Sequence, residues 1–304
     1  MQISNNVIFA GGAWVWNGIA PNYSKTFECT ISALQTCKKF KLDEVLCTAW
    51  LDNGAETPID AVLPGVTLFS YLGFHKNYDS NEFKEEFKNC CSGYLDDFMV
   101  LDRFDSLFQK EESNQAAENP SKYLLYQDPL TGIFDYHVKE SAVDTKAYYD
   151  SLRLNVMESE KHSKKYLELF SYYEKLAEVL SIKADLGVRL KTSYEASDLY
   201  TLKTICEKEI PDTIESLKIM KTLREDLWMR DAKPWGYELM DVKLGGVITR
   251  LESTKRRVLN YVDGKIPCLE ELEEKRLPYF GDKADKRENR WSQIISGSDL
   301  VDTI

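Results

Sequence analysis

The chain has 304 residues, of which 43% are hydrophobic and 29% charged, and this composition predicts a folded protein with a real core rather than a disordered one. Its formal net charge is −11, which argues against nucleic acid as a partner, because binding phosphates requires clustered Lys and Arg. The first apolar run, 7–13, contains two glycines and has no basic segment before it. Neither a signal peptide nor a membrane span is therefore expected.

Short apolar runs alternate with amphipathic segments over the first hundred residues. Val7–Ala10 and Val45–Ala49 are predicted strands, and the second is a continuous apolar run typical of a buried parallel strand. A helix capped by its first residue is expected over 24–40, and further helical segments are expected near 59–72 and 81–94. This order predicts two successive β/α units of a parallel sheet.

The periodicity changes in the second half of the chain. Residues 110–122 are polar and predict a boundary, and Tyr123–Tyr136 is expected to be irregular or a short β segment. Apolar residues then recur at helical spacing within 166–180, 210–227 and 244–262. Three or four long amphipathic helices with short connections predict an antiparallel bundle.

Cysteine and histidine usage gives little sign of a metal site. The seven cysteines are scattered without a Cys-x-x-Cys pair, which favours buried, reduced thiols in a cytoplasmic protein. The three histidines, His75, His137 and His162, lie far apart and are interpreted as surface or packing residues. No metal and no cofactor are expected.

Aromatic and polar residues follow both predicted strands directly. Trp14, Trp16 and Asn17 come after the first strand, and Trp50 and Asp52 come after the second. An α/β barrel keeps its chemistry beyond the carboxyl ends of its strands, but a complete barrel needs roughly 200 residues or more. The sequence thus predicts either a small open sheet or the last quarter of a barrel whose earlier strands lie outside this chain.

These strand-end motifs resemble those of family 20 glycoside hydrolases, and most closely the bacterial β-N-acetylhexosaminidases with a helical C-terminal domain. Phe9–Asn22 is similar to the seventh-strand region, and Thr48–Thr57 is similar to the eighth-strand end, with Leu51 where the group usually has Gly. The helical part carries further similar segments, which are Ile182–Gly187, Lys233–Glu238 and Leu244–Gly246.

The resemblance implies an α/β plus all-α fold, in which the last two β/α units of an incomplete TIM-type barrel are followed by an antiparallel helical bundle. The expected organisation is a partial barrel over 1–110, a connecting segment over 111–141, a helical domain over 142–280 and a frayed tail over 281–304.

It also implies an exo-β-N-acetylhexosaminidase, which hydrolyses terminal N-acetylhexosaminides with retention through the substrate's own acetamido group. Such enzymes use an adjacent Asp-Glu pair after the fourth barrel strand, which would lie before residue 1 here. The acidic pairs of this chain follow no predicted strand, and they are Glu85-Glu86, Asp96-Asp97, Glu111-Glu112, Glu270-Glu271 and Glu273-Glu274. The chain alone is therefore expected to be inactive.

In this reading Trp50 is a wall of the sugar pocket and Asp52 accepts hydrogen bonds from sugar hydroxyls; the alternatives are a core tryptophan and a turn residue. Trp14 and Trp16 are expected to point to different sides, with one of them facing the pocket, and Asn17 is a weaker polar candidate. Glu56 is expected to bond backbone amides or to cap the next helix.

The expected partners are glycans that end in N-acetylhexosamine, and either a polypeptide carrying the N-terminal half or a second copy of the chain. Nucleic acid and membrane are not expected as partners. The alternative to an enzyme fragment is a non-catalytic interaction or dimerisation module, or a residual sugar-binding fragment. The sequence does not distinguish gluco- from galacto-configured or non-acetylated sugars.

Overall fold

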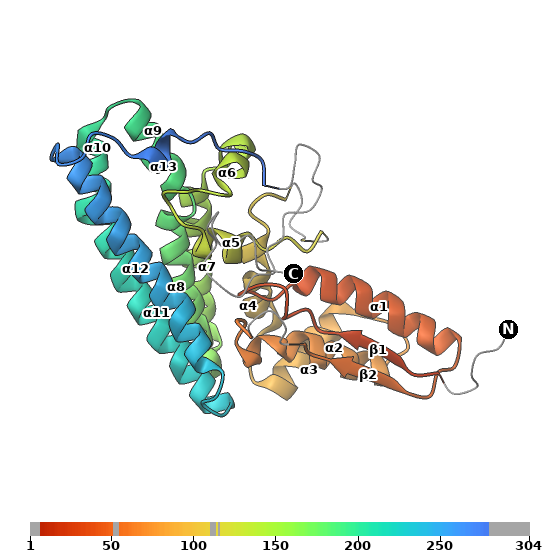
Figure 1. The fold of residues 1–304 in the computed structure, drawn as a ribbon. Coiled ribbons are helices and arrows are strands. Elements are labelled where there is room, and N and C mark those ends of the chain that lie inside the picture. The colour runs from red at the N-terminus through yellow and green to blue at the C-terminus, as the bar shows by residue number, and fades with distance from the viewer. Residues whose placement is uncertain (1–6, 51–54, 110–113, 115, 280–304) are drawn as a thin grey trace.

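The computed structural model describes residues 7–50, 55–109, 114 and 116–279, and within these residues the fold is mainly helical (Figure 1). The two strands are β1 (Phe9–Gly12) and β2 (Val45–Thr48). The α-helices are α1 (Tyr23–Lys39), α2 (Leu63–Phe74), α3 (Ser80–Cys91), α4 (Leu95–Met99), α5 (Pro120–Tyr126), α6 (Asp135–Ser141), α7 (Thr145–His162), α8 (Leu167–Lys183), α9 (Leu186–Glu195), α10 (Leu199–Thr204), α11 (Ile210–Asp231), α12 (Tyr237–Val262) and α13 (Glu270–Glu273). Shorter 3₁₀ segments span Ile59–Val62, Val100–Asp105 and Lys164–Tyr166, and a π-helical segment spans Ile205–Glu209.

A β–α–β unit forms the N-terminal part, as the alternating apolar pattern predicts. β1 and β2 pair in parallel, with Phe9 opposite Val45 and Gly12 opposite Thr48. The crossover helix α1 begins after Asn22, whose side chain accepts a hydrogen bond from the Lys25 backbone N–H at 3.0 Å. The expected cap was the residue two positions later, but the Asn22 carboxamide satisfies one of the free N–H groups of the first turn.

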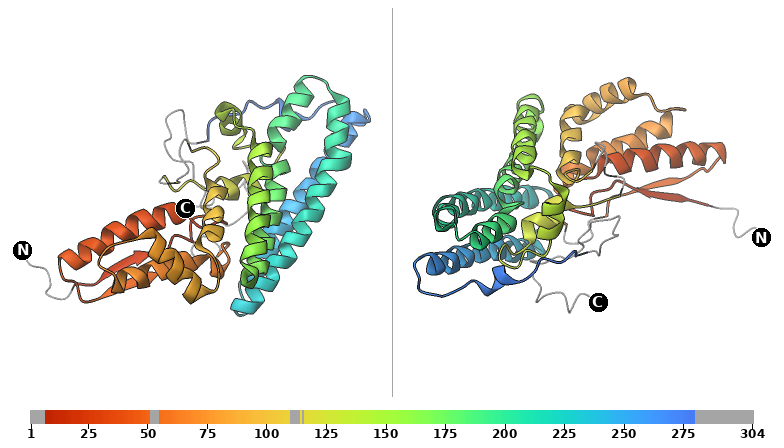
Figure 2. Two further views of the ribbon diagram at one scale, coloured as in Figure 1. Left: turned by 180° about the vertical axis from the view of Figure 1, so that it is seen from behind. Right: turned by 90° about the horizontal axis from the view of Figure 1, so that it is seen from above.

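Helices α1 and α2 lie on the same side of the two strands (Figure 2). A Cβ atom at Gly11 would lie 2.9 Å from the Phe69 ring of α2, so the face of the sheet that carries Gly11 and Cys47 packs against helices. Neighbouring residues of a strand point to opposite faces. Ala10 and Leu46, which are paired across the strands, therefore occupy the other face, and both are exposed.

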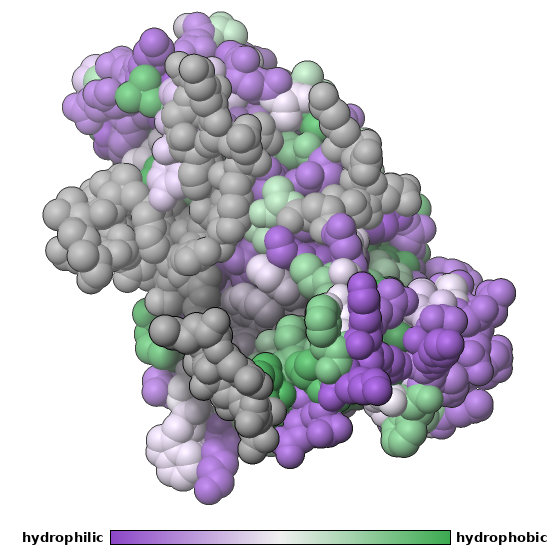
Figure 3. Space-filling view, turned by 90° about the vertical axis from the view of Figure 1, so that its right-hand side faces the viewer, coloured by the Kyte–Doolittle hydropathy of each residue, from purple (hydrophilic) through white to green (hydrophobic). Residues whose placement is uncertain are grey.

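That second face is the main departure from the expected buried strand. Leu46 on this face is 54% exposed, because helices cover only the other face of the two strands. Val45, which shares the helix side with Cys47, is also 41% exposed. Hydrophobic patches are visible among hydrophilic ones at the end of the molecule that carries the strands (Figure 3). We call the face formed by Ala10, Gly12, Leu46 and Thr48 the open face of the sheet.

Long helices α7, α8, α11 and α12 run side by side and form the C-terminal part (Figure 1), and α8 contacts both α7 and α11. Leu217, Met220 and Leu227 of α11 are almost completely buried. Their spacing of three and seven places them on one face, and each stabilises the fold by about 1.5–3 kcal/mol relative to an exposed position. The three predicted apolar stripes correspond to α8, α11 and α12.

Two further expectations hold only in part. Within 123–136, residues 128–134 are irregular, as expected, and Gln127 is an isolated bridge residue, but the two ends of the range belong to α5 and α6. All seven cysteines are free, as expected, but Cys29 and Cys90 are exposed rather than buried. Within the described residues, no helix is both long enough and apolar enough to cross a membrane.

Candidate functional site

The carboxyl ends of β1 and β2 lie together at one edge of the sheet. The Ala13 N–H donates a hydrogen bond of 2.8 Å to the Thr48 carbonyl, and the Thr48 hydroxyl donates one of 3.0 Å to the Gly11 carbonyl. Parallel pairing therefore continues to the last strand residues, and both loops leave the sheet at the same edge. This is the edge at which open and closed α/β sheets bind ligands.

Trp16 lies on the open face of the sheet. A Cβ atom at Gly12 would lie 2.7 Å from the Trp16 indole, so the absence of a side chain at Gly12 lets the indole lie against the strand. The Trp14 ring lies beside it, with 4.5 Å between the ring centroids. The ammonium of Lys25, on α1, lies 4.7 Å from the centroid of Trp14.

The expectation that the two tryptophans point apart is wrong. Residues i and i+2 share a side on an extended chain, and here the chain bends after β1, with Val15 buried between them. The bend is held because the Trp14 N–H donates to the Thr26 hydroxyl at 2.9 Å and the Trp14 carbonyl accepts from the Asn22 N–H at 2.8 Å. The two indoles form one aromatic surface at the end of β1.

The Trp50 side chain is accessible to a ligand, whereas the Asn17 side chain is used in a hydrogen bond within the chain. The Trp50 side chain directly follows β2 and is 54% exposed, so it can contact a ligand. The Asn17 carboxamide donates a hydrogen bond of 2.5 Å to the Ala117 carbonyl, and its backbone carbonyl accepts one of 2.6 Å from Asn119. Asn17 therefore holds the loop after β1 to the segment before α5. Asp52 lies outside the described residues.

Glu56 has partners that the sequence did not reveal. Its side chain is fully buried, with one carboxylate oxygen 3.2 Å from the Lys122 ammonium of α5 and the other in direct contact with the Lys243 ammonium of α12. Burial lowers the pKa of the Lys243 amine, while the adjacent carboxylate favours its charged form. Glu56 therefore does not cap the next helix; its carboxylate joins the loop after β2 to two helices.

Other hydrogen bonds also fix the strand-end loops to the helices. Arg224 of α11 donates to the Ala55 carbonyl at 2.9 Å and to the Glu56 carbonyl at 3.3 Å. Tyr173 of α8 donates to the Ile19 carbonyl at 2.9 Å. The loop after β1 and the loop after β2 are joined to each other by the Thr57 hydroxyl, which donates to the Gly18 carbonyl at 2.9 Å.

A buried carboxyl group lies beneath the loop after β1. Asp105 accepts hydrogen bonds from the Ser121 N–H at 2.9 Å and from the Ser121 hydroxyl at 2.6 Å. Burial raises the pKa of Asp105 to about 7, although the Ser121 hydrogen bonds lower it. Since Asp105 is 3% exposed, it supports the loop from inside rather than reaching a ligand.

Where the structure describes them, the acidic pairs named above lie on or beside helices, and none directly follows β1 or β2. Glu85-Glu86 lies on α3, Asp96-Asp97 lies in the first turn of α4, Glu270-Glu271 begins α13 and Glu273-Glu274 lies at its end. Glu111-Glu112 lies outside the described residues. The described strand ends thus offer aromatic surface and hydrogen-bonding groups, which suit binding of a sugar ring.

Several cavities lie on the described part of the chain. One, of about 410 Å³, is lined by residues of α6, α9 and the segment after α13, including Asp135 and Arg276. Another, of about 140 Å³, lies between the segment after β2 and α11, and Arg224 and Trp228 contribute to it. The indole N–H of Trp228 donates to the Lys233 carbonyl at 2.8 Å, so this tryptophan supports the α11–α12 connection.

Comparison with known protein families identifies the helical part. Residues 96–291 match the family described as the glycoside hydrolase 20C C-terminal domain, and this range is well over half of the chain. It includes every helix of the bundle, whereas β1, α1 and β2 precede it. A search of curated proteins finds no match. The chain therefore belongs to the glycoside hydrolase 20C C-terminal domain family and is a C-terminal portion of a family 20 glycoside hydrolase.

Proposed function

We propose that this chain supplies the last two β/α units of the sugar-cleaving barrel of an exo-β-N-acetylhexosaminidase, together with the helical domain that supports them. The observation that carries the proposal is the position of Trp16. In a TIM-type barrel the helices cover the outside of the sheet, and the other face lines the interior. Trp16 lies over Gly12 on the face opposite α1 and α2, at the carboxyl end where such barrels bind substrate.

Trp50 would complete the wall of the pocket from the neighbouring strand. It follows β2 directly and is 54% exposed, and an indole binds the apolar face of a sugar ring by burying it from water. Asp52 would bind sugar hydroxyls, because an ionised carboxylate accepts short hydrogen bonds. Trp14 would support Trp16, whose ring centroid lies 4.5 Å away, and Asn17 would hold the loop rather than the sugar.

The helical domain would act by positioning these loops. Glu56, Arg224 and Tyr173 connect the two strand-end loops to α5, α8, α11 and α12. Holding substrate-binding groups in a fixed geometry is a principal source of catalytic rate. The helical domain would thus contribute to catalysis without touching the substrate.

The catalytic Asp-Glu pair would come from a polypeptide segment outside these 304 residues. In the substrate-assisted mechanism the acetamido oxygen of the sugar attacks the anomeric carbon while the Glu protonates the leaving oxygen. The Asp orients the acetamide. In this proposal the present chain binds the sugar, and the segment that carries the earlier strands transfers the proton.

Hydrolysis of a chromogenic N-acetylglucosaminide tests the proposal. The purified chain alone should give no enzyme-like turnover, whereas co-expression with a family 20 segment that carries the first six strands should restore it. Trp50→Ala should then reduce turnover, and Trp235→Ala, which alters a 76% exposed tryptophan of the helical part, should not. Robust turnover by the chain alone, or a restored activity indifferent to Trp50→Ala, would contradict the proposal.

A second function is favoured by exposed apolar residues in and next to the strands. Val7 and Ile8, just before β1, are each 58% exposed, and Leu46 of β2 is 54% exposed, which leaves apolar surface open at the sheet. Two copies of the chain could cover these residues by pairing, in which case the chain would be a dimerisation module. Size-exclusion chromatography with light scattering distinguishes the two, since a stable, well-folded monomer contradicts the dimer.

A further inference from the structure

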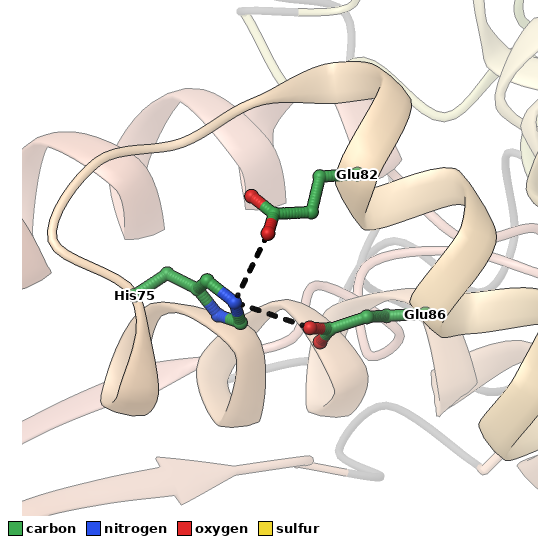
Figure 4. Close-up of side chains that lie close together, drawn as sticks. All are labelled: His75, Glu82 and Glu86. Atoms are coloured by element: carbon green, nitrogen blue, oxygen red, sulfur yellow. Dashed lines mark ion pairs between the residues drawn. The ribbon is translucent and has the colours of Figure 1, made fainter.

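The corner between α2 and α3 brings one histidine and two glutamates together (Figure 4). His75 follows the last residue of α2, and Glu82 and Glu86 lie one helical turn apart on α3, so that both carboxylates occupy one face of that helix. The His75 Nε2 atom lies 3.4 Å from Glu82 Oε1 and 3.2 Å from Glu86 Oε1. We propose that these three side chains bind a divalent transition-metal ion, with Zn²⁺ as the fitting ion.

The separations between His75 and each of the two glutamate oxygens fit a tetrahedral ion. Bonds from Zn²⁺ to nitrogen and oxygen are about 2.0–2.2 Å, which places neighbouring ligands of a tetrahedron roughly 3.3–3.6 Å apart. The three ligand atoms all lie within 4.8 Å of one another, and the two nitrogen–oxygen distances of 3.4 and 3.2 Å are close to this spacing. A charge-assisted hydrogen bond would be about 2.7–2.9 Å long.

The surroundings of His75 orient it for metal binding. Its Nδ1 atom lies 3.0 Å from the Tyr71 carbonyl, and since a carbonyl can only accept, Nδ1 carries the proton. In a neutral ring the Nε2 lone pair then points at the two carboxylates, an arrangement that a cation between them would stabilise. A backbone carbonyl as the second partner of the imidazole is typical of metal-bound histidine.

Tyr71 holds the remaining parts of the site. Its hydroxyl donates a hydrogen bond of 2.8 Å to Glu82 Oε2 and accepts one of 3.3 Å from the Asp79 N–H. Its ring stacks on the His75 imidazole, with 4.1 Å between the centroids and 12° between the planes. One residue of α2 therefore fixes the histidine by stacking and one glutamate by hydrogen bonding, which pre-organises two of the three ligands.

Exposure and charge define the kind of site. The side chains of His75, Glu82 and Glu86 are 29%, 53% and 38% exposed, so an ion can enter from solvent and a water molecule can complete the tetrahedron. Lys38 also lies at this corner, where its ammonium binds the His75 backbone carbonyl. Three protein ligands would hold the ion between α2 and α3 and leave its fourth position to water.

Calorimetric titration of the full chain with ZnCl₂ at pH 7.5, with the cysteines kept reduced, tests this site. One ion per chain should bind, and His75→Ala and Glu86→Gln should each weaken binding at least tenfold. Glu85→Gln is the matched control, because this exposed acid lies on the same helix one position from Glu86 and its substitution makes the same change in charge. It should leave the affinity unchanged.

A second measurement separates a metal site from a protonated histidine paired with two glutamates. Zn²⁺ should raise the unfolding temperature of the unaltered chain and of Glu85→Gln but not of His75→Ala. An ion pair alone predicts no shift in any of them. Absence of saturable binding would overturn the proposal. So would equal affinity in His75→Ala, which would assign the ion to the exposed thiols of Cys29 or Cys90.

Discussion

Replacing Glu56 with glutamine should destabilise the fold, because this buried carboxylate is shared by two buried lysines. Its oxygens lie 3.2 Å from the Lys122 ammonium and in direct contact with the Lys243 ammonium. Removing one partner of a buried ion pair costs about 3–5 kcal/mol, because the other charge remains in a medium that solvates it poorly. Glutamine keeps the size and one oxygen, so we expect about 3 kcal/mol, the lower end of this range.

Urea unfolding followed by circular dichroism measures the change. The control is Glu215→Gln on α11, where the carboxylate is 69% exposed and 3.9 Å from Lys218; it should alter the free energy of unfolding by less than about 0.5 kcal/mol. Combining Glu56→Gln with Lys243→Met should recover part of the loss, because the unpaired ammonium is removed. A loss below about 1 kcal/mol for Glu56→Gln, too small for a broken buried pair, would refute the reasoning.

Two further predictions concern buried titratable groups, and a third concerns the contact between Gly12 and Trp16. Burial lowers the pKa of Lys183 to about 7, so between pH 7 and about pH 10 the native form has lost a proton that the unfolded form keeps. The free energy of unfolding should therefore rise over this range. Lys183→Met should flatten that rise, as measured by urea unfolding at both pH values. Burial raises the pKa of Asp105 to about 7, so stability should fall as pH rises from about 4 to 7. Asp105→Asn should remove that fall, and an unchanged pH profile would contradict the assignment. Gly12→Val places a side chain where a Cβ lies 2.7 Å from the Trp16 ring, and it should cost about 1–3 kcal/mol and shift tryptophan fluorescence. Gly245→Ala, with no atom within 4 Å of its added Cβ, lies inside α12; it should not destabilise the fold, because alanine is favoured over glycine in a helix interior, and it should leave the fluorescence unchanged.

Sequence periodicity was enough to predict β1, α1, β2, α8, α11 and α12, because each has an apolar pattern set by local geometry. It failed at α5, where every residue is buried and no polar face reveals the helical period. The burial of β2 was also mispredicted. An apolar run shows that a strand can be buried, but its exposure depends on which other segments cover it.

Less of the candidate site than of the fold could be predicted from the sequence. Trp16, Trp50 and their place after the strands followed from the motifs, since parallel strands end at one edge of a sheet. The partners of Glu56 lie on α5 and α12, far away in the sequence, and no local pattern indicates them. The sequence predicts His75 to be an isolated histidine, because Glu82 and Glu86 have the pattern of ordinary charges on a solvent-exposed helix. Only the α2–α3 corner of the folded chain brings the three side chains together.

The most direct test of the account is saturation-transfer NMR with N-acetylglucosamine, comparing the unaltered chain with Trp50→Ala and Trp235→Ala. Both tryptophans are exposed, at 54% and 76%, so both variants should fold. If the strand ends form a sugar-binding surface, the signal should be present in the unaltered chain and in Trp235→Ala and should be lost in Trp50→Ala. No transfer to the sugar, or equal transfer in all three proteins, would contradict the account.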